Sequence, residues 1–150
     1  MSFSEIVAQA QVTPHDQIIQ EGNNMQVNVS KGFLHLTMNV LLQHQNFEEI
    51  ISFVNSDVLI YQILATIGLR KLLSFEQSPP IQQTVDRNMI PRLLQLSQVL
   101  DSPKLQFEAI WCLTNIASSD STFVLKLIEN SAIPVLIGIT NSNTHIEVKE

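Results

Sequence analysis

The sequence predicts an all-α domain built from repeated helical units, and three observations support this. Apolar positions from Phe47 onward follow a helical period, polar clusters and prolines separate these stretches, and similar segments recur at a spacing near 43 residues. A chain of 150 residues with 45% hydrophobic content is long and apolar enough for one domain with a core.

The first helical stretches are separated by residues that end helices. An apolar stripe over residues 47–54 precedes Asn55-Ser56-Asp57, whose side chains can cap the helix that follows. A second stretch spans residues 58–74. Ser78-Pro79-Pro80 follows it, and two prolines cannot continue a helix.

An internal repeat defines the organisation of the chain. Residues 89–94 align with 132–137 at an offset of 43, and residues 65–74 align with 109–118 at an offset of 44. A period near 43 with only helical patterns inside is typical of armadillo and HEAT repeats. We therefore expect a right-handed armadillo-repeat superhelix, a truncated solenoid, with units at about 47–88, 89–131 and 132–150.

Residues 1–46 form an N-terminal extension. Residues 1–31 are rich in Gln, Asn and Ser and predict a loose tail. Residues 32–44 are apolar enough for a helix or a strand, and a helix there would cap the solenoid.

The long third helix of the middle unit should span residues 103–118. Its proline at the start suits the first helical turn. Trp111, Asn115 and Ser118 share one face, which should line the concave side of the solenoid. The buried stripe on a different face comprises Leu105, Ala109, Cys112, Leu113 and Ile116.

Residues 105–118, LQFEAIWCLTNIAS, resemble the second armadillo repeat of the importin-alpha family, whose pattern is close to LQFEAAWALTNIAS. Residues 54–81 resemble the first repeat of that family, and residues 130–150 resemble the start of the third. The resemblance implies an adaptor for nuclear import that binds basic nuclear localisation signals of cargo proteins. Such an adaptor would be found in both cytoplasm and nucleus.

The resemblance also implies which residues bind the signal peptide. Trp111 would stack on a lysine stem and attract its ammonium group, and the Asn115 amide would hold the peptide backbone. Ile67 and Lys71 occupy the corresponding Trp and Asn positions of the first unit, so no second clamp is expected there. The implied peptide-binding set is Trp111, Asn115, Ser118, Leu73, Ser74 and Glu76.

Departures from the family pattern limit these expectations. Ser131 replaces a glycine before the Ala-Ile-Pro step, which predicts backbone strain there. Residues 1–46 hold one cation, so the basic importin-beta-binding segment of the family is missing and importin-beta docking cannot be inferred. The sequence stops at Glu150, before the expected position of the next Trp–Asn pair, so we expect weaker binding than in a receptor with several clamps.

Composition and motifs exclude several other functions. A net charge of −6 and few Lys and Arg residues argue against nucleic-acid binding, and no segment is suited to span a membrane. One cysteine excludes a multi-cysteine zinc site, and Cys112 is expected to be packed and inert. The four histidines lack catalytic or metal-binding spacing, and no phosphate-binding glycine motif is present. We expect no enzyme activity, no cofactor and no metal.

A second interpretation remains open at this point. The chain is then a truncated importin-alpha paralogue that acts as a protein-interaction scaffold or has no transport activity. Five of the six site residues also have a purely structural explanation. Trp111 and Leu73 can serve as core residues, Ser118 can satisfy backbone groups at a helix end, and Asn115 and Glu76 can be solvated.

Overall fold

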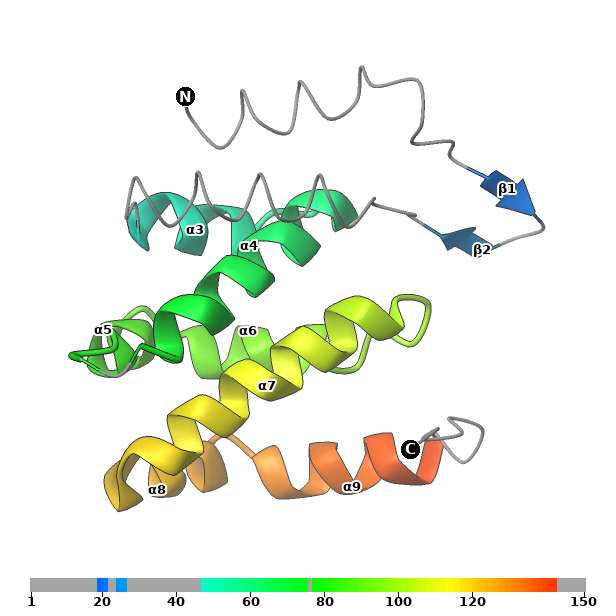
Figure 1. Ribbon diagram of the computed structural model, residues 1–150. Helices are drawn as coiled ribbons and strands as arrows, with labels where there is room; N and C mark the ends of the chain where they lie inside the picture. Colours follow the sequence, from blue (N-terminus) through cyan, green and yellow to red (C-terminus); the bar gives the residue numbers. More distant parts are fainter. Residues whose placement is uncertain (1–18, 22–23, 27–46, 76, 143–150) are drawn as a thin grey trace.

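The computed structural model describes residues 19–21, 24–26, 47–75 and 77–142. Within these ranges, helices form the body of the molecule, and α4 and α7 run diagonally across it (Figure 1). The elements are β1 (Ile19–Glu21), β2 (Asn24–Gln26), α3 (Phe47–Val54), α4 (Leu59–Leu73), α5 (Ile81–Asp86), α6 (Met89–Leu96), α7 (Pro103–Ser119), α8 (Ser121–Glu129) and α9 (Ala132–Ser142).

The helices pack in the order of the chain. Helix α3 packs on α4, α6 packs on both α5 and α7, and α8 lies between α7 and α9. The contact between α4 and α7 joins the first expected unit to the second, because α4 and α7 are the long helices of these units. This arrangement confirms the all-α armadillo solenoid that the repeat spacing predicts.

The N-terminal extension holds a feature that sequence analysis missed. Strands β1 and β2 pair antiparallel, with Gln20 opposite Met25. Residues 1–31 carried the prediction of a loose tail, yet two residues, Gly22-Asn23, separate the strands, and Gly-Asn is a recognised hairpin signal. The expected helix or strand over 32–44 lies outside the described residues.

The core follows the predicted stripes on α3 and α7. Ile50, Ile51 and Val54 are buried on α3, and all five residues of the predicted α7 stripe are buried. Helix α4 differs from its prediction, because every residue from 63 to 69 is buried rather than a single stripe. The Thr66 hydroxyl in this segment makes no hydrogen bond within the described part of the chain.

The ends of α7 and α8 show capping by side chains. Ser102 precedes α7, and its hydroxyl oxygen accepts a hydrogen bond from the Leu105 amide at 3.4 Å, with Pro103 in the first turn as predicted. Asp120 caps α8 by accepting hydrogen bonds from the amide and hydroxyl of Thr122 at 2.8 and 2.7 Å. These bonds favour the carboxylate and lower the pKa of Asp120.

Two residues with left-handed backbone mark equivalent places in consecutive units. Asn88 has a φ of 57° just before α6, and Ser131 has a φ of 63° just before α9. They lie 43 residues apart, which is the sequence period. The strain expected at Ser131 is therefore present, since only glycine adopts this conformation freely and asparagine tolerates it better than serine.

No single helix within the described ranges has the length and apolar character to cross a membrane. Helices α8 and α9 meet those criteria only when taken together, and they are bent by 73° relative to each other.

Candidate functional site

Trp111, Asn115 and Ser118 lie on successive turns of α7, on the face away from its buried stripe. The Trp111 side chain is 41% exposed, Asn115 is half-buried and Ser118 is exposed. The helix thus places these three residues on one accessible face, whereas Cys112 and Leu113 next to them point into the core. The Trp111 indole is therefore partly in solvent and does not serve only as a core anchor.

The Trp111 indole has a cation of the protein itself beside it. The Arg70 guanidinium carbon lies 4.4 Å from the centroid of the indole ring, within the range of a cation–π interaction. Phe107, one turn earlier on α7, packs edge-on against the indole, with ring centroids 5.4 Å apart and an interplanar angle of 82°. The indole is therefore held between a residue of α4 and a residue of its own helix.

Asn115 links α7 to the end of α4. Its side-chain nitrogen donates one hydrogen bond to the Arg70 carbonyl at 3.3 Å and another to the Ser74 hydroxyl oxygen at 3.0 Å. The Ser74 hydroxyl donates to the same Arg70 carbonyl at 2.7 Å. Both donors of the amide are used in this way, so its oxygen is the atom left for a ligand.

A buried carboxylate anchors the cation beside the indole. Glu108 on α7 is 1% exposed and forms an ion pair with Arg70, whose side chain is 17% exposed. Lys104, one turn before Glu108, binds its other carboxylate oxygen at 2.7 Å. Two cations against one acid give this cluster a net positive charge, although the whole chain carries −6.

The remaining predicted site residues are placed less favourably. The Ser118 hydroxyl donates to the carbonyls of Thr114 and Asn115 at 2.9 and 3.2 Å, which matches its structural explanation. Leu73 is buried in the core beside exposed Ser74. Glu76 lies outside the described residues. Ile67, in the tryptophan position of the first unit, is buried and presents no second clamp.

Cys112 is packed as the sequence predicts. It is completely buried, and its thiol lies 3.6 Å from the Thr66 carbonyl of α4. Burial raises the pKa of the Cys112 thiol, and the nearby Glu108 carboxylate adds to this effect. A thiol that stays protonated is a poor nucleophile. In the part of the chain that the structure describes, no three His, Cys, Asp or Glu residues gather as a metal site would require.

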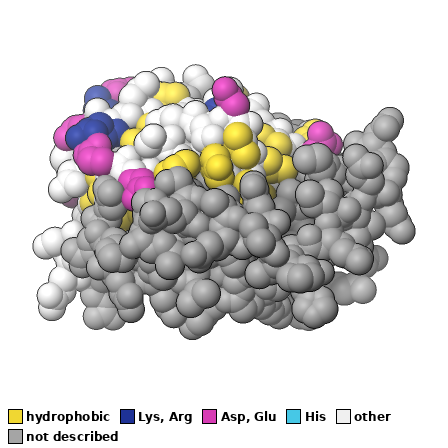
Figure 2. Space-filling model, turned by 90° about the horizontal axis from the view of Figure 1, so that it is seen from above, with side chains coloured by type: hydrophobic (Ala, Val, Ile, Leu, Met, Phe, Trp, Pro, Cys, Tyr) yellow, Lys and Arg dark blue, Asp and Glu magenta, His cyan; other side chains and the backbone are white. Residues whose placement is uncertain are grey.

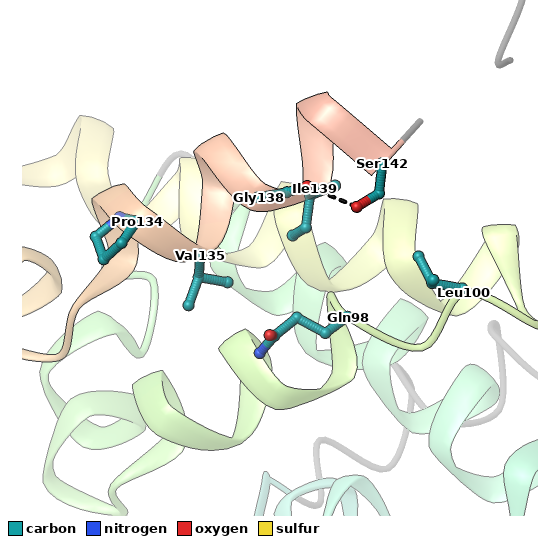
Figure 3. A pocket seen from close by; sticks show the side chains of 7 residues that line it. All are labelled: Gln98, Leu100, Pro134, Val135, Gly138, Ile139 and Ser142. Carbon is teal, nitrogen blue, oxygen red and sulfur yellow. Dashed lines mark hydrogen bonds between the residues drawn. The ribbon is translucent and has the colours of Figure 1, made fainter. Parts of the chain in front are cut away.

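A cavity of about 390 Å³ lies elsewhere, between α9 and the turn that joins α6 to α7 (Figure 3). Val135 and Ile139 point toward Gln98 across this space, and Ser142 bonds back to its own helix at the Gly138 carbonyl (Figure 3). None of the predicted site residues lines it. The lining residues are Gln98, Leu100, Pro134, Val135, Gly138, Ile139 and Ser142.

The described surface seen from above carries hydrophobic side chains beside charged ones (Figure 2). Acidic and basic side chains lie next to each other at the left of this view, and further acidic side chains lie apart from them (Figure 2).

Comparison with known proteins places the site in a family context. A sequence profile for the armadillo/beta-catenin-like repeat matches residues 69–118, which include Arg70, Glu108, Trp111 and Asn115. The chain is 43% identical over 89 residues to importin subunit alpha-1b of Oryza sativa subsp. japonica and 48% identical over 81 residues to importin subunit alpha-3 of Arabidopsis thaliana. It is 40% identical over 112 residues to importin subunit alpha-B of Dictyostelium discoideum.

These matches cover 59%, 54% and 73% of this chain, respectively. They cover only 17%, 15% and 22% of the relatives, so the chain spans about a fifth of the length of the importin alpha subunits that it matches.

Proposed function

This chain belongs to the importin-alpha family of armadillo-repeat proteins, and from that premise we propose that it binds basic nuclear-localisation-signal peptides as an adaptor of nuclear import. The observation that carries the proposal is the exposed Trp111 indole with Asn115 one turn later on α7. The proposed activity requires access to both the cytoplasm and the nucleus.

The geometry defines how each side chain would contact an extended peptide. The free part of the Trp111 indole offers a flat apolar surface to the methylene stem of a lysine. Asn115 donates both amide hydrogens to Arg70 and Ser74, so it would accept a backbone N–H of the peptide through its oxygen. In this proposal the Asn115 amide would hold the peptide backbone as a hydrogen-bond acceptor only.

Charge acts at two ranges in this proposal. The net charge of −6 favours the approach of a basic peptide through solution. Close to the indole, however, Arg70 and Lys104 outnumber Glu108, so a lysine ammonium should extend away from this cluster while its stem stays on the ring. Added salt should therefore slow the association of the peptide, whereas loss of the Trp111 indole should weaken the contact in the bound state.

Replacing Trp111 by alanine tests the proposal. We expect the W111A variant to bind a fluorescent lysine-rich signal peptide at least about threefold more weakly, because one stacked lysine is lost. Fluorescence anisotropy measures the affinity, and far-UV circular dichroism checks that helicity is retained. Leu125→Ala, which truncates an exposed apolar side chain on α8, is the matched control and should bind normally. Equal affinity of W111A and the unaltered protein would contradict the assignment of Trp111 to the peptide-binding site.

A second candidate function is a protein-interaction scaffold without transport activity. It is favoured by the exposed apolar side chains of α8 and α9, which include Leu125, Ile133 and Ile137. In this case peptide affinity is unaffected by Trp111, while the chain still unfolds in a cooperative helical transition on heating. A chain that shows no such transition is a poorly folded fragment, and neither function then applies.

A further inference from the structure

We propose that Arg70 is the positioning residue of the Trp111–Asn115 site, an inference that rests on the proposed peptide binding. Arg70 lies in the last turn of α4, next to Lys71, and it contacts both halves of the site from the neighbouring unit. Its guanidinium lies against the Trp111 indole, and its carbonyl receives the Asn115 amide.

The guanidinium is fixed before any ligand arrives. Glu108 is buried and needs a cationic partner, so removal of Arg70 would leave that carboxylate with Lys104 alone. A planar guanidinium that binds a carboxylate along one edge can present its flat face to an aromatic ring at the same time. The Arg70 guanidinium therefore stays against the Trp111 indole when a peptide lysine binds.

The fixed position of Arg70 limits which part of a peptide lysine can contact the indole. Arg70 takes the cation-attracting position on the indole, so the peptide lysine contributes mainly its apolar stem there. Arg70 and Phe107 together also keep the indole from rotating toward solvent. Correct placement of Trp111 then depends on a contact across two units.

The experiment uses the one tryptophan of the chain as its probe. Trp111 is the sole tryptophan in the sequence, so intrinsic fluorescence reports its surroundings alone. Arg70→Gln should expose the covered indole face and raise the acrylamide quenching constant by about twofold. The same variant should weaken binding of a lysine-rich signal peptide by about threefold to tenfold.

Lys104→Gln is the matched control. It removes the other cation from Glu108 at a similar position in the ion-pair network, but the Lys104 ammonium lies 5.9 Å from the Phe107 ring rather than over Trp111. We expect Lys104→Gln to leave the quenching of Trp111 unchanged and to bind the lysine-rich peptide no more weakly than the unaltered protein, because it removes a cation that repels the peptide lysine. Arg70→Lys, which keeps the charge and loses the planar guanidinium, should fall between Arg70→Gln and the unaltered protein.

The outcomes separate this inference from the proposed function. If the unaltered protein binds no signal peptide, the proposed function fails, and the quenching comparison still decides whether Arg70 positions Trp111. If Arg70→Gln and Lys104→Gln give the same quenching in folded protein, the positioning role is overturned. If Arg70→Gln does not fold, Arg70→Lys carries the same comparison, and unchanged quenching there overturns the proposal as well.

Discussion

Helix α7 and the α8–α9 pair all contain many apolar residues but differ sharply in burial. The buried stripe of α7 faces α4 and α6, and α8 packs on it as well. In contrast, Leu127 is the one buried residue of α8, and Ala132 and Ile139 are those of α9. Large apolar side chains exposed on these two helices are Val124, Leu125, Ile128, Ile133, Leu136 and Ile137.

This difference shows that the burial of apolar side chains in a solenoid depends on the neighbouring helices and not only on the sequence of one helix. Helix α7 packs against α4, α6 and α8 and buries its apolar stripe, whereas α9 packs mainly on α8 and leaves much of its apolar surface in water. The candidate binding residues belong to the packed region, since Arg70 and Trp111 lie where α4 meets α7.

The largest effect should come from shortening a leucine in the packed region. Leu105→Ala removes a fully buried side chain and should lower the free energy of unfolding by about 2–5 kcal/mol, through lost burial and a new cavity. Leu125→Ala on α8, where the side chain is 59% exposed, should change it by less than about 0.5 kcal/mol. Urea denaturation followed by circular dichroism measures both, and similar losses would abolish the contrast between the two regions.

An alkaline pH should weaken the packed region through Cys112. The folded pKa of this thiol is raised above its ordinary value of 9.0, so above that pH the unfolded chain releases a proton that the folded chain retains. Stability from this group is complete below pH 9.0 and falls as pH rises beyond it, by about 1.4 kcal/mol per pH unit.

The matched variant for the pH effect is Cys112→Ala, which lacks the thiol. Its free energy of unfolding should fall less steeply between about pH 9 and about pH 10 than that of the unaltered protein. Parallel slopes for the two proteins would show that Cys112 does not titrate differently in the folded and unfolded chains.

The smallest effect compares Asn88 and Ser131, the two left-handed residues that lie one sequence period apart. Ser131→Gly should raise the free energy of unfolding by about 0.5–1 kcal/mol, because glycine removes the steric cost of a positive φ and loses part of the gain to chain entropy. Asn88→Gly should have almost no effect, since asparagine already tolerates this conformation. Thermal melting of both variants tests the difference, and an equal gain at the two positions would contradict it.

Local patterns in the sequence predicted much of the fold. Helix α7 begins at Pro103 as expected, ends at Ser119 rather than 118, and buries each residue of its predicted stripe. These features depend on helix capping and on a 3.6-residue period, both of which are visible in a short window. The departure of Ser131 from the family's glycine also predicted backbone strain there, and its φ of 63° confirms this prediction.

The surroundings of the site could not be predicted in the same way. Arg70 and Trp111 are 41 residues apart, and no local pattern links a cation on one helix to an indole on another. Lys104 and Glu108 have the spacing of a helical ion pair, but that spacing normally indicates an exposed face rather than a buried carboxylate. The all-round burial of residues 63–69 likewise depends on which elements surround α4.

The burial of residues 63–69 of α4 affects the entropy cost of the proposed peptide binding. Arg70 follows directly after seven consecutive buried residues of α4. The backbone that carries Arg70 therefore cannot shift without disturbing packing on several sides. A receptor surface that is already rigid loses little conformational entropy when an extended peptide docks. Such preorganisation would let a single aromatic contact contribute most of its intrinsic strength to binding.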